Sequence, residues 1–87
     1  MKTVYKYDIP ITDYFSLDLP ANSRILSVQV QRDIPCIWVE IDTEETQCRT
    51  DFRLVGTGHN LKEDNLLYIG TFQLFNGMLV YHLYEVL

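Results

Sequence analysis

Apolar and polar side chains alternate one by one along most of this sequence, and this alternation constrains the fold more than any other feature. In residues 24–31 (RILSVQVQ), three aliphatic side chains share one side of an extended chain, namely Leu26, Val28 and Val30. Side chains of a β-strand point alternately to its two faces, whereas an amphipathic helix repeats about every 3.6 residues. No long segment carries the helical repeat. The sequence therefore predicts an all-β protein.

Seven short segments have this β character, and turn-forming residues separate them. We expect strands at residues 3–9, 14–19, 24–31, 36–42, 46–55, 66–74 and 78–86. Arg32-Asp33 is the expected tip of one hairpin, and Asn76-Gly77, a strong type I′ signal, is that of the last one. A chain of 87 residues suits one domain. We predict a single domain over residues 1–87, a small antiparallel β-sandwich or partly open barrel of about six to seven strands.

Charge and composition limit the classes of partner. The formal net charge is −5, and the seven basic residues are scattered, so we expect no binding to bulk nucleic acid, which depends on Lys and Arg. No apolar stretch approaches the roughly 18 residues of a membrane span, and the first residues lack the apolar core of a signal peptide. We expect no membrane contact and a cytoplasmic location. Cys36 and Cys48 are expected to be reduced and packed as small apolar side chains.

The turn Gly56-Thr57-Gly58-His59 follows a predicted strand and invites a chemical interpretation. Backbone amides of a glycine-rich turn can hold a phosphate, and Arg53 would add positive charge. The candidate ligand-binding residues are Arg53, Thr57, Gly58 and His59. The third glycine, the lysine and the following helix of phosphate-binding loops are missing. The alternative is that the two glycines only supply positive φ angles for a turn.

Catalytic and metal-binding interpretations have little support in the sequence. An imidazole can serve as general acid or base, but His59 has no neighbouring serine or cysteine nucleophile, and nothing in the sequence brings it to His82. Carboxylate pairs such as Asp42 and Glu44 do not match the spacing of a calcium loop. We therefore expect no catalytic residue, no metal and no cofactor. The sequence favours a binding protein over an enzyme.

Two predicted strands carry apolar or aromatic side chains on both faces. If Ile37, Val39 and Ile41 fill the core, then Cys36 and Trp38 point outward. The last strand is largely apolar on both sides as well. A monomer with one core should present a polar outer face, and Trp and Tyr are enriched at interfaces. We expect a homo-oligomer, with these interface residues: Trp38, Val80, His82 and Tyr84. The alternative is that these strands lie in the middle of a two-layer fold.

Six segments spread over the chain also carry a resemblance to known sequences. They are YKYDI (5–9), ILSVQVQ (25–31), PCIWVEID (35–42), FRLVGTGHNL (52–61), YIGTFQ (68–73) and LVYHLYE (79–85). VGTGH followed by YIGTF is the most specific combination. The chain resembles a family of small uncharacterised proteins of bacteriophage and prophage genomes. That family has no assigned reaction, so the resemblance implies an origin rather than an activity.

A phage origin would favour certain roles. Short phage proteins commonly block host defences, and stoichiometric inhibition needs a surface but no catalytic machinery. The leading hypothesis is a host-defence antagonist that sequesters a small nucleotide signal, with Trp38 or a tyrosine stacking on the base. One alternative is an inhibitor that binds a host defence protein through Trp38 and Tyr84. Another is a minor virion or assembly component.

Overall fold

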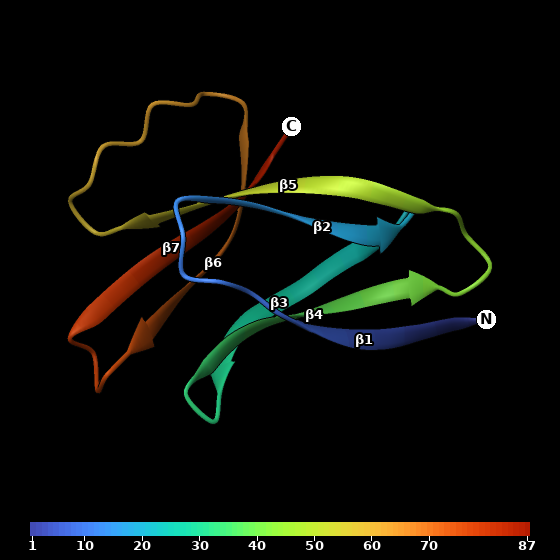
Figure 1. Cartoon of the computed structure of the whole chain (residues 1–87), viewed down its shortest axis with the longest axis horizontal. Coiled ribbons are helices and arrows are strands. Elements are labelled where there is room, and N and C mark those ends of the chain that lie inside the picture. The colour runs from blue at the N-terminus through green and yellow to red at the C-terminus, as the bar shows by residue number, and fades with distance from the viewer.

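The computed structural model describes residues 1–87, and the chain folds into seven strands in two antiparallel sheets (Figure 1). One sheet has the order β1-β4-β3 and the other the order β2-β5-β7-β6. The strands are β1 (Lys2–Asp8), β2 (Tyr14–Pro20), β3 (Arg24–Gln31), β4 (Ile34–Asp42), β5 (Gln47–Gly56), β6 (Leu66–Leu74) and β7 (Leu79–Val86). The sheets do not close into a barrel, so of the two predicted architectures the structure is the sandwich. It has no helix that could cross a membrane.

The core lies between the two sheets and is built by the inward side of each alternating strand. Eleven buried side chains form one cluster, to which both sheets contribute. The prediction that Ile37, Val39 and Ile41 face the core is confirmed, because all three are at most 3% exposed. Phe52 and Leu54 of β5 are buried as well. Alternation with period two thus decides which side of each strand is apolar.

The predicted inward face of β3 is wrong at one position. The pairing of β3 with β4 shifts between Ile25 and Ser27, which marks a bulge at Leu26. A bulge adds one residue to one strand and reverses the alternation beyond it. Ile25 therefore packs against the core, while Leu26 is 44% exposed. Val28 and Val30 stay on the inward face as predicted.

Of the two cysteines, Cys36 is packed as a small apolar side chain, as predicted, whereas Cys48 is not. Cys36 lies on the side of β4 opposite the core residues, yet it is completely buried, so it does not project to the surface. β4 is the central strand, and Cys36 sits between Asp8 of β1 and Gln29 of β3 in the register. Its thiol sulfur lies 3.6 Å from the backbone carbonyl oxygens of Gln29 and Ile34. Cys48 is free and exposed rather than packed.

Both predicted hairpin tips are confirmed by their backbone angles. Arg32 and Asp33 have φ angles of 51° and 66°, and Asn76 and Gly77 of 55° and 85°, the positive values that a type I′ turn requires. In the last hairpin the Met78 amide donates to the Phe75 carbonyl at 3.1 Å.

The connection from β5 to β6 is the longest in the chain, for a topological reason. Both strands pair with β7 in antiparallel fashion, so they run parallel to each other. Parallel strands cannot be joined by a tight turn. The chain leaves β5 at Gly56 and enters β6 at Leu66. Leu66 and Asp51 both pair with Val86 of β7, so the chain must run back alongside β5 to the level of Asp51 before β6 begins. Residues 57–65, here called the return loop, form the wide arc between β5 and β6 in Figure 1.

The two sheets approach closely where β6 meets β3. A Cβ atom on Gly70 would lie 2.6 Å from Cγ1 of Val28, which is itself buried. This is well inside van der Waals contact, and a branched side chain in a packed core has little room to move. Glycine at position 70 is thus required by the distance between the sheets.

We predict that Gly70→Ala lowers the free energy of unfolding by about 1–3 kcal/mol, because the added methyl group overpacks the core. The melting temperature should fall by roughly 4–8 °C per kcal/mol, measured by circular dichroism. Val28→Ala in the same chain should relieve the clash, so the double variant should lose less than the sum of the two single losses. If the losses of unfolding free energy in the two single variants simply add up in the double variant, the contact between positions 70 and 28 does not cause the destabilisation.

Candidate functional site

Arg53, the first predicted ligand-binding residue, lies on the outer face of the four-stranded sheet but is buried. Its side chain is only 7% exposed. Its Nε donates to Glu63 Oε1 at 2.9 Å, its Nη1 to the Leu54 carbonyl at 2.6 Å and its Nη2 to the Asn60 carbonyl at 3.0 Å. Glu63 and Asn60 both belong to the return loop. The guanidinium therefore ties this loop to β5, and its donors are occupied within the chain.

Tyr14 of β2 completes this arrangement, here called the Arg53 cluster (Arg53, Glu63 and Tyr14). The Arg53 guanidinium carbon lies 4.8 Å from the centre of the Tyr14 ring, and the Tyr14 hydroxyl donates to both Glu63 oxygens at 2.9 and 3.1 Å. This hydrogen bond raises the pKa of Tyr14. Partial burial works against ionisation of Glu63, but hydrogen bonds from Tyr14 and Arg53 outweigh it and lower the pKa of Glu63. The cluster therefore holds an ionised Glu63 at neutral pH.

Two of the four backbone amides of the turn at Gly56–His59 already have carbonyl partners within the chain. The Thr57 amide donates to the Val80 carbonyl and the His59 amide to the Gly56 carbonyl, both at 3.1 Å. Gly58 has a φ of 87°, and no atom lies within 4 Å of the place where its Cβ would be. A phosphate cradle needs several converging free amides. Of the two glycines only Gly58 has the positive φ that the turn interpretation predicted, whereas Gly56 does not. The hydrogen bonds still fit a turn better than a phosphate cradle, and Arg53 points to Asn60 and Glu63 rather than to this turn.

The exposed His59 ring lies between two small hollows. Its Nδ1 would be 3.1 Å from a Cβ on Gly56, so the missing side chain of Gly56 makes room for the ring. One hollow, of about 200 Å³, lies between the turn and the start of β7. The other, of about 210 Å³, lies toward the β1–β2 connection and includes Asp13. Each is smaller than the roughly 300 Å³ at which ligand pockets usually begin.

His82, predicted as an interface residue, is held at both ring nitrogens by hydroxyl groups. Thr57 Oγ1 lies 2.7 Å from Nε2, and Thr71 Oγ1 lies 2.9 Å from Nδ1. Thr71 also contacts the Tyr68 hydroxyl at 2.5 Å. Residues far apart in the sequence meet here because Thr71 of β6 pairs with His82 of β7. This network could not be predicted from the sequence, because its residues are far apart in the chain and meet only through the pairing of the strands.

The predicted interface residues do not form one surface. Trp38 lies on the outer side of the three-stranded sheet, opposite the inward Ile37 and Val39. Val80, His82 and Tyr84 alternate with the buried Leu83, so they lie on the outer side of the four-stranded sheet. The sandwich places these two groups on opposite sides of the molecule. Within one copy of the chain, Trp38 and Tyr84 therefore do not lie on one continuous sheet face.

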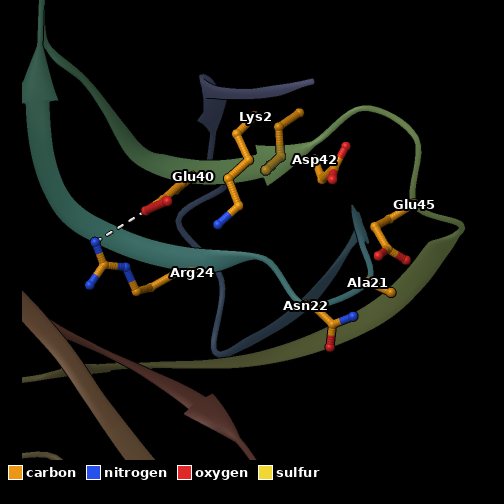
Figure 2. A pocket seen from close by; sticks show the side chains of 8 residues that line it. Lys2, Ala21, Asn22, Arg24, Glu40, Asp42 and Glu45 are labelled. Carbon is orange, nitrogen blue, oxygen red and sulfur yellow. Dashed lines mark hydrogen bonds and ion pairs between the residues drawn. The ribbon is translucent and has the colours of Figure 1, made fainter.

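The largest cavity, of about 390 Å³, lies elsewhere and is polar (Figure 2). Lys2 and Arg24 supply positive charge, and Arg24 pairs with Glu40 at 3.1 Å. Asp42 and Glu45 add two further carboxylates. Three carboxylates against two basic side chains give no positive field for a phosphate. In the whole chain no three His, Cys, Asp or Glu side chains are arranged to hold a metal ion.

The β6–β7 hairpin stands out by its charge. No Asp, Glu, Lys or Arg occurs from Asn65 to Tyr84, although the chain carries 19 such residues elsewhere, 12 acidic and 7 basic. At its tip Phe75 is 67% exposed and Met78 83%. On its outer face Tyr68 is 56% exposed and packs edge-on against Tyr84, with ring centres 5.5 Å apart. From Asn65 to Tyr84 this hairpin is an uncharged, partly aromatic surface on an acidic protein, and Glu85 near the end of β7 is its one charged residue.

Fold and surface together define a small two-sheet β-sandwich whose chain carries no charged side chain from Asn65 to Tyr84. The chain belongs to the family described as a domain of unknown function, DUF7352, whose model matches residues 1–87. No curated protein and no solved structure matches the chain.

The lowered pKa of Glu63 predicts that acid loosens the return loop. A carboxylate with a lowered pKa stabilises the folded state above its ordinary range, and this stabilisation is lost as the pH falls through the lowered value. The Arg53 Nε–H signal in NMR spectra should therefore be protected at neutral pH and lose protection well below pH 4.5, the ordinary pKa of a Glu side chain. Glu63→Gln should reduce the protection already at neutral pH.

Asp64→Asn is the matched control for this measurement, because Asp64 is the exposed neighbour of Glu63 in the same loop. Its Arg53 signal should follow that of the unmodified protein. Equal loss of protection in both variants would contradict the assignment of loop anchoring to Glu63.

Proposed function

We propose that this protein acts by binding another protein through the outer face of β6 and β7. This surface, here called the Tyr84 face, consists of Tyr68, Thr71, His82 and Tyr84. The observation that carries the proposal is the uncharged stretch from Asn65 to Tyr84 with its aromatic pair, the exposed Tyr68 and the partly buried Tyr84. Tyrosine is enriched at protein interfaces, and charged residues are depleted at their centres.

The hydrogen bonds of the predicted ligand site favour a protein partner over a nucleotide. An external phosphate would compete with Glu63 for Arg53, whose side chain is already buried. The amides of Thr57 and His59 would have to leave their carbonyl partners. An uncharged sheet face instead suits the broad contact of two proteins, about 800 Å² on each side in a typical complex.

The resemblance to small phage and prophage proteins suggests the setting for such binding. In that setting we propose that the protein antagonises a host defence by occupying the surface of a defence protein. Blocking of this kind works at one inhibitor per target and needs no reaction. The rigid frame of two sheets would hold the Tyr84 face in one shape, which lowers the entropy lost on binding.

Nucleotide sequestration is the second candidate, favoured by a single feature. Gly58 has a positive φ and open space around it, next to the exposed His59. If this turn holds a nucleotide, freshly purified protein should release an intact nucleotide on heating, detected by mass spectrometry of the supernatant. A cleaved product would instead indicate catalysis.

For the protein-binding proposal we predict that Tyr68→Asp abolishes capture of the partner by the immobilised protein from host extract. The substitution places a charge at the centre of the Tyr84 face, where a desolvated carboxylate would have no partner. Because Tyr68 is exposed, the melting temperature should stay within a few degrees of that of the unmodified protein. Defence of the host against phage should also return in cells that express this variant.

Val4→Asp is the matched control. Val4 is 49% exposed and lies on the outer side of the opposite sheet, where it pairs with Glu40. This variant should capture the partner as well as the unmodified protein does. Loss of capture with Val4→Asp together with normal capture by Tyr68→Asp would place the contact on the wrong sheet and refute the proposal.

A further inference from the structure

The tip of the β6–β7 hairpin and the Gly56–His59 turn form one end of the molecule, here called the hairpin end. It carries a projecting part and a hollow. The projecting part is the tip, with Phe75 67% and Met78 83% exposed. The hollow, of about 200 Å³, is lined by Gly56, Thr57, His59, Met78, Leu79, Val80 and Tyr81. None of these residues is Asp, Glu, Lys or Arg.

The backbone holds Phe75 in an unusual position. Its φ of 51° begins a run of three positive φ angles that continues through Asn76 and Gly77. Asparagine and glycine tolerate this region, whereas a bulky aromatic residue there is an outlier. Strained positions of this kind persist where the surrounding structure enforces them, and they cluster at functional sites. Here the strain accompanies an aromatic ring that is turned out into solvent.

The hollow exists because β7 extends beyond β5. The pairing of β7 with β5 ends at Gly56 and Tyr81, while its pairing with β6 continues to Leu74 and Leu79. The first residues of β7 therefore have β6 on one side and only the turn on the other. The turn covers this step incompletely, because Thr57 bonds to the Val80 carbonyl and the chain then leaves the sheet.

We propose that a second copy of this chain docks here, with Phe75 of each copy entering the hollow of the other. A two-fold symmetric contact requires a surface that is complementary to itself, and the hairpin end offers both a projection and a recess. Charge points to the same place. Two copies that each carry −5 repel one another on average, and at the hairpin end they would meet without charged groups on the tip or in the lining of the hollow.

This dimer is independent of the binding partner proposed above, because the two contacts use different surfaces. The Tyr84 face lies on the outer face of β6 and β7, whereas the projecting part lies at the tip of the hairpin. The two proposals can therefore fail separately. Loss of the dimer would leave capture through the single copy possible, and Tyr68→Asp would leave the dimer intact.

The test uses a pair of variants with opposite charges, Phe75→Asp on the projection and His59→Lys in the hollow. Both positions are exposed, so each variant should fold with the circular dichroism spectrum of the unmodified protein. By light scattering, the unmodified protein should have the mass of two chains at high concentration, and each variant alone the mass of one. Mixing the variants should restore the two-chain mass. A mixed dimer has two contacts between projection and hollow. In one, the carboxylate introduced by Phe75→Asp faces the ammonium group introduced by His59→Lys. In the other, the original Phe75 enters the hollow with the original His59.

Val4→Asp again serves as control and should keep the two-chain mass, since it adds the same charge to the opposite sheet. Native mass spectrometry of the mixture should show one chain of each variant in every dimer. The proposal is overturned if the unmodified protein has a single-chain mass at all concentrations, if Phe75→Asp remains dimeric, or if the mixture forms no mixed dimer.

Discussion

The buried guanidinium of Arg53 is the interaction on which the arrangement of the proposed binding surfaces depends. A buried cation is tolerated only when it is paired and hydrogen-bonded, and Arg53 obtains both from Glu63 and from the carbonyls of Leu54 and Asn60. Because Glu63 and Asn60 belong to the return loop, this one side chain fixes the path of the loop over nine residues of irregular structure. The return loop connects the Gly56–His59 turn to β6. Fixing the loop therefore also fixes the position of the hollow relative to the β6–β7 hairpin.

The edges of the sheets bear on our proposal that other proteins bind to the β6–β7 hairpin. Lys2 and Lys6 lie on edge strand β1, and Asp18 and Pro20 on edge strand β2. Charge and proline on an edge discourage further strand pairing. β3 and β6 pack closely through Val28 and the bare backbone of Gly70. We therefore propose the uncharged face and the tip of the β6–β7 hairpin, rather than the sheet edges, as the surfaces that bind other chains.

Much of the fold could be predicted from the sequence, and the errors have physical causes. The strands, both hairpin tips and the inward faces of β4 and β5 follow from alternation and from turn-forming residues. The bulge at Leu26 could not be foreseen, because a bulge depends on how two strands fit together and leaves the composition unchanged. Cys36 shows the same limit, since its burial comes from neighbours on both sides of a central strand.

The candidate site was less accessible to sequence reasoning. The sequence by itself determined the β-strands, the positive φ angles of the turns and the absence of charge from Asn65 to Tyr84, because these depend on local chemistry. Only the tertiary structure decided that Arg53 is an anchor of the return loop, that His82 joins Thr57 to Thr71, and that Trp38 and Tyr84 face opposite ways. The reason is that each of these depends on strand order and register, which pair residues far apart in the chain.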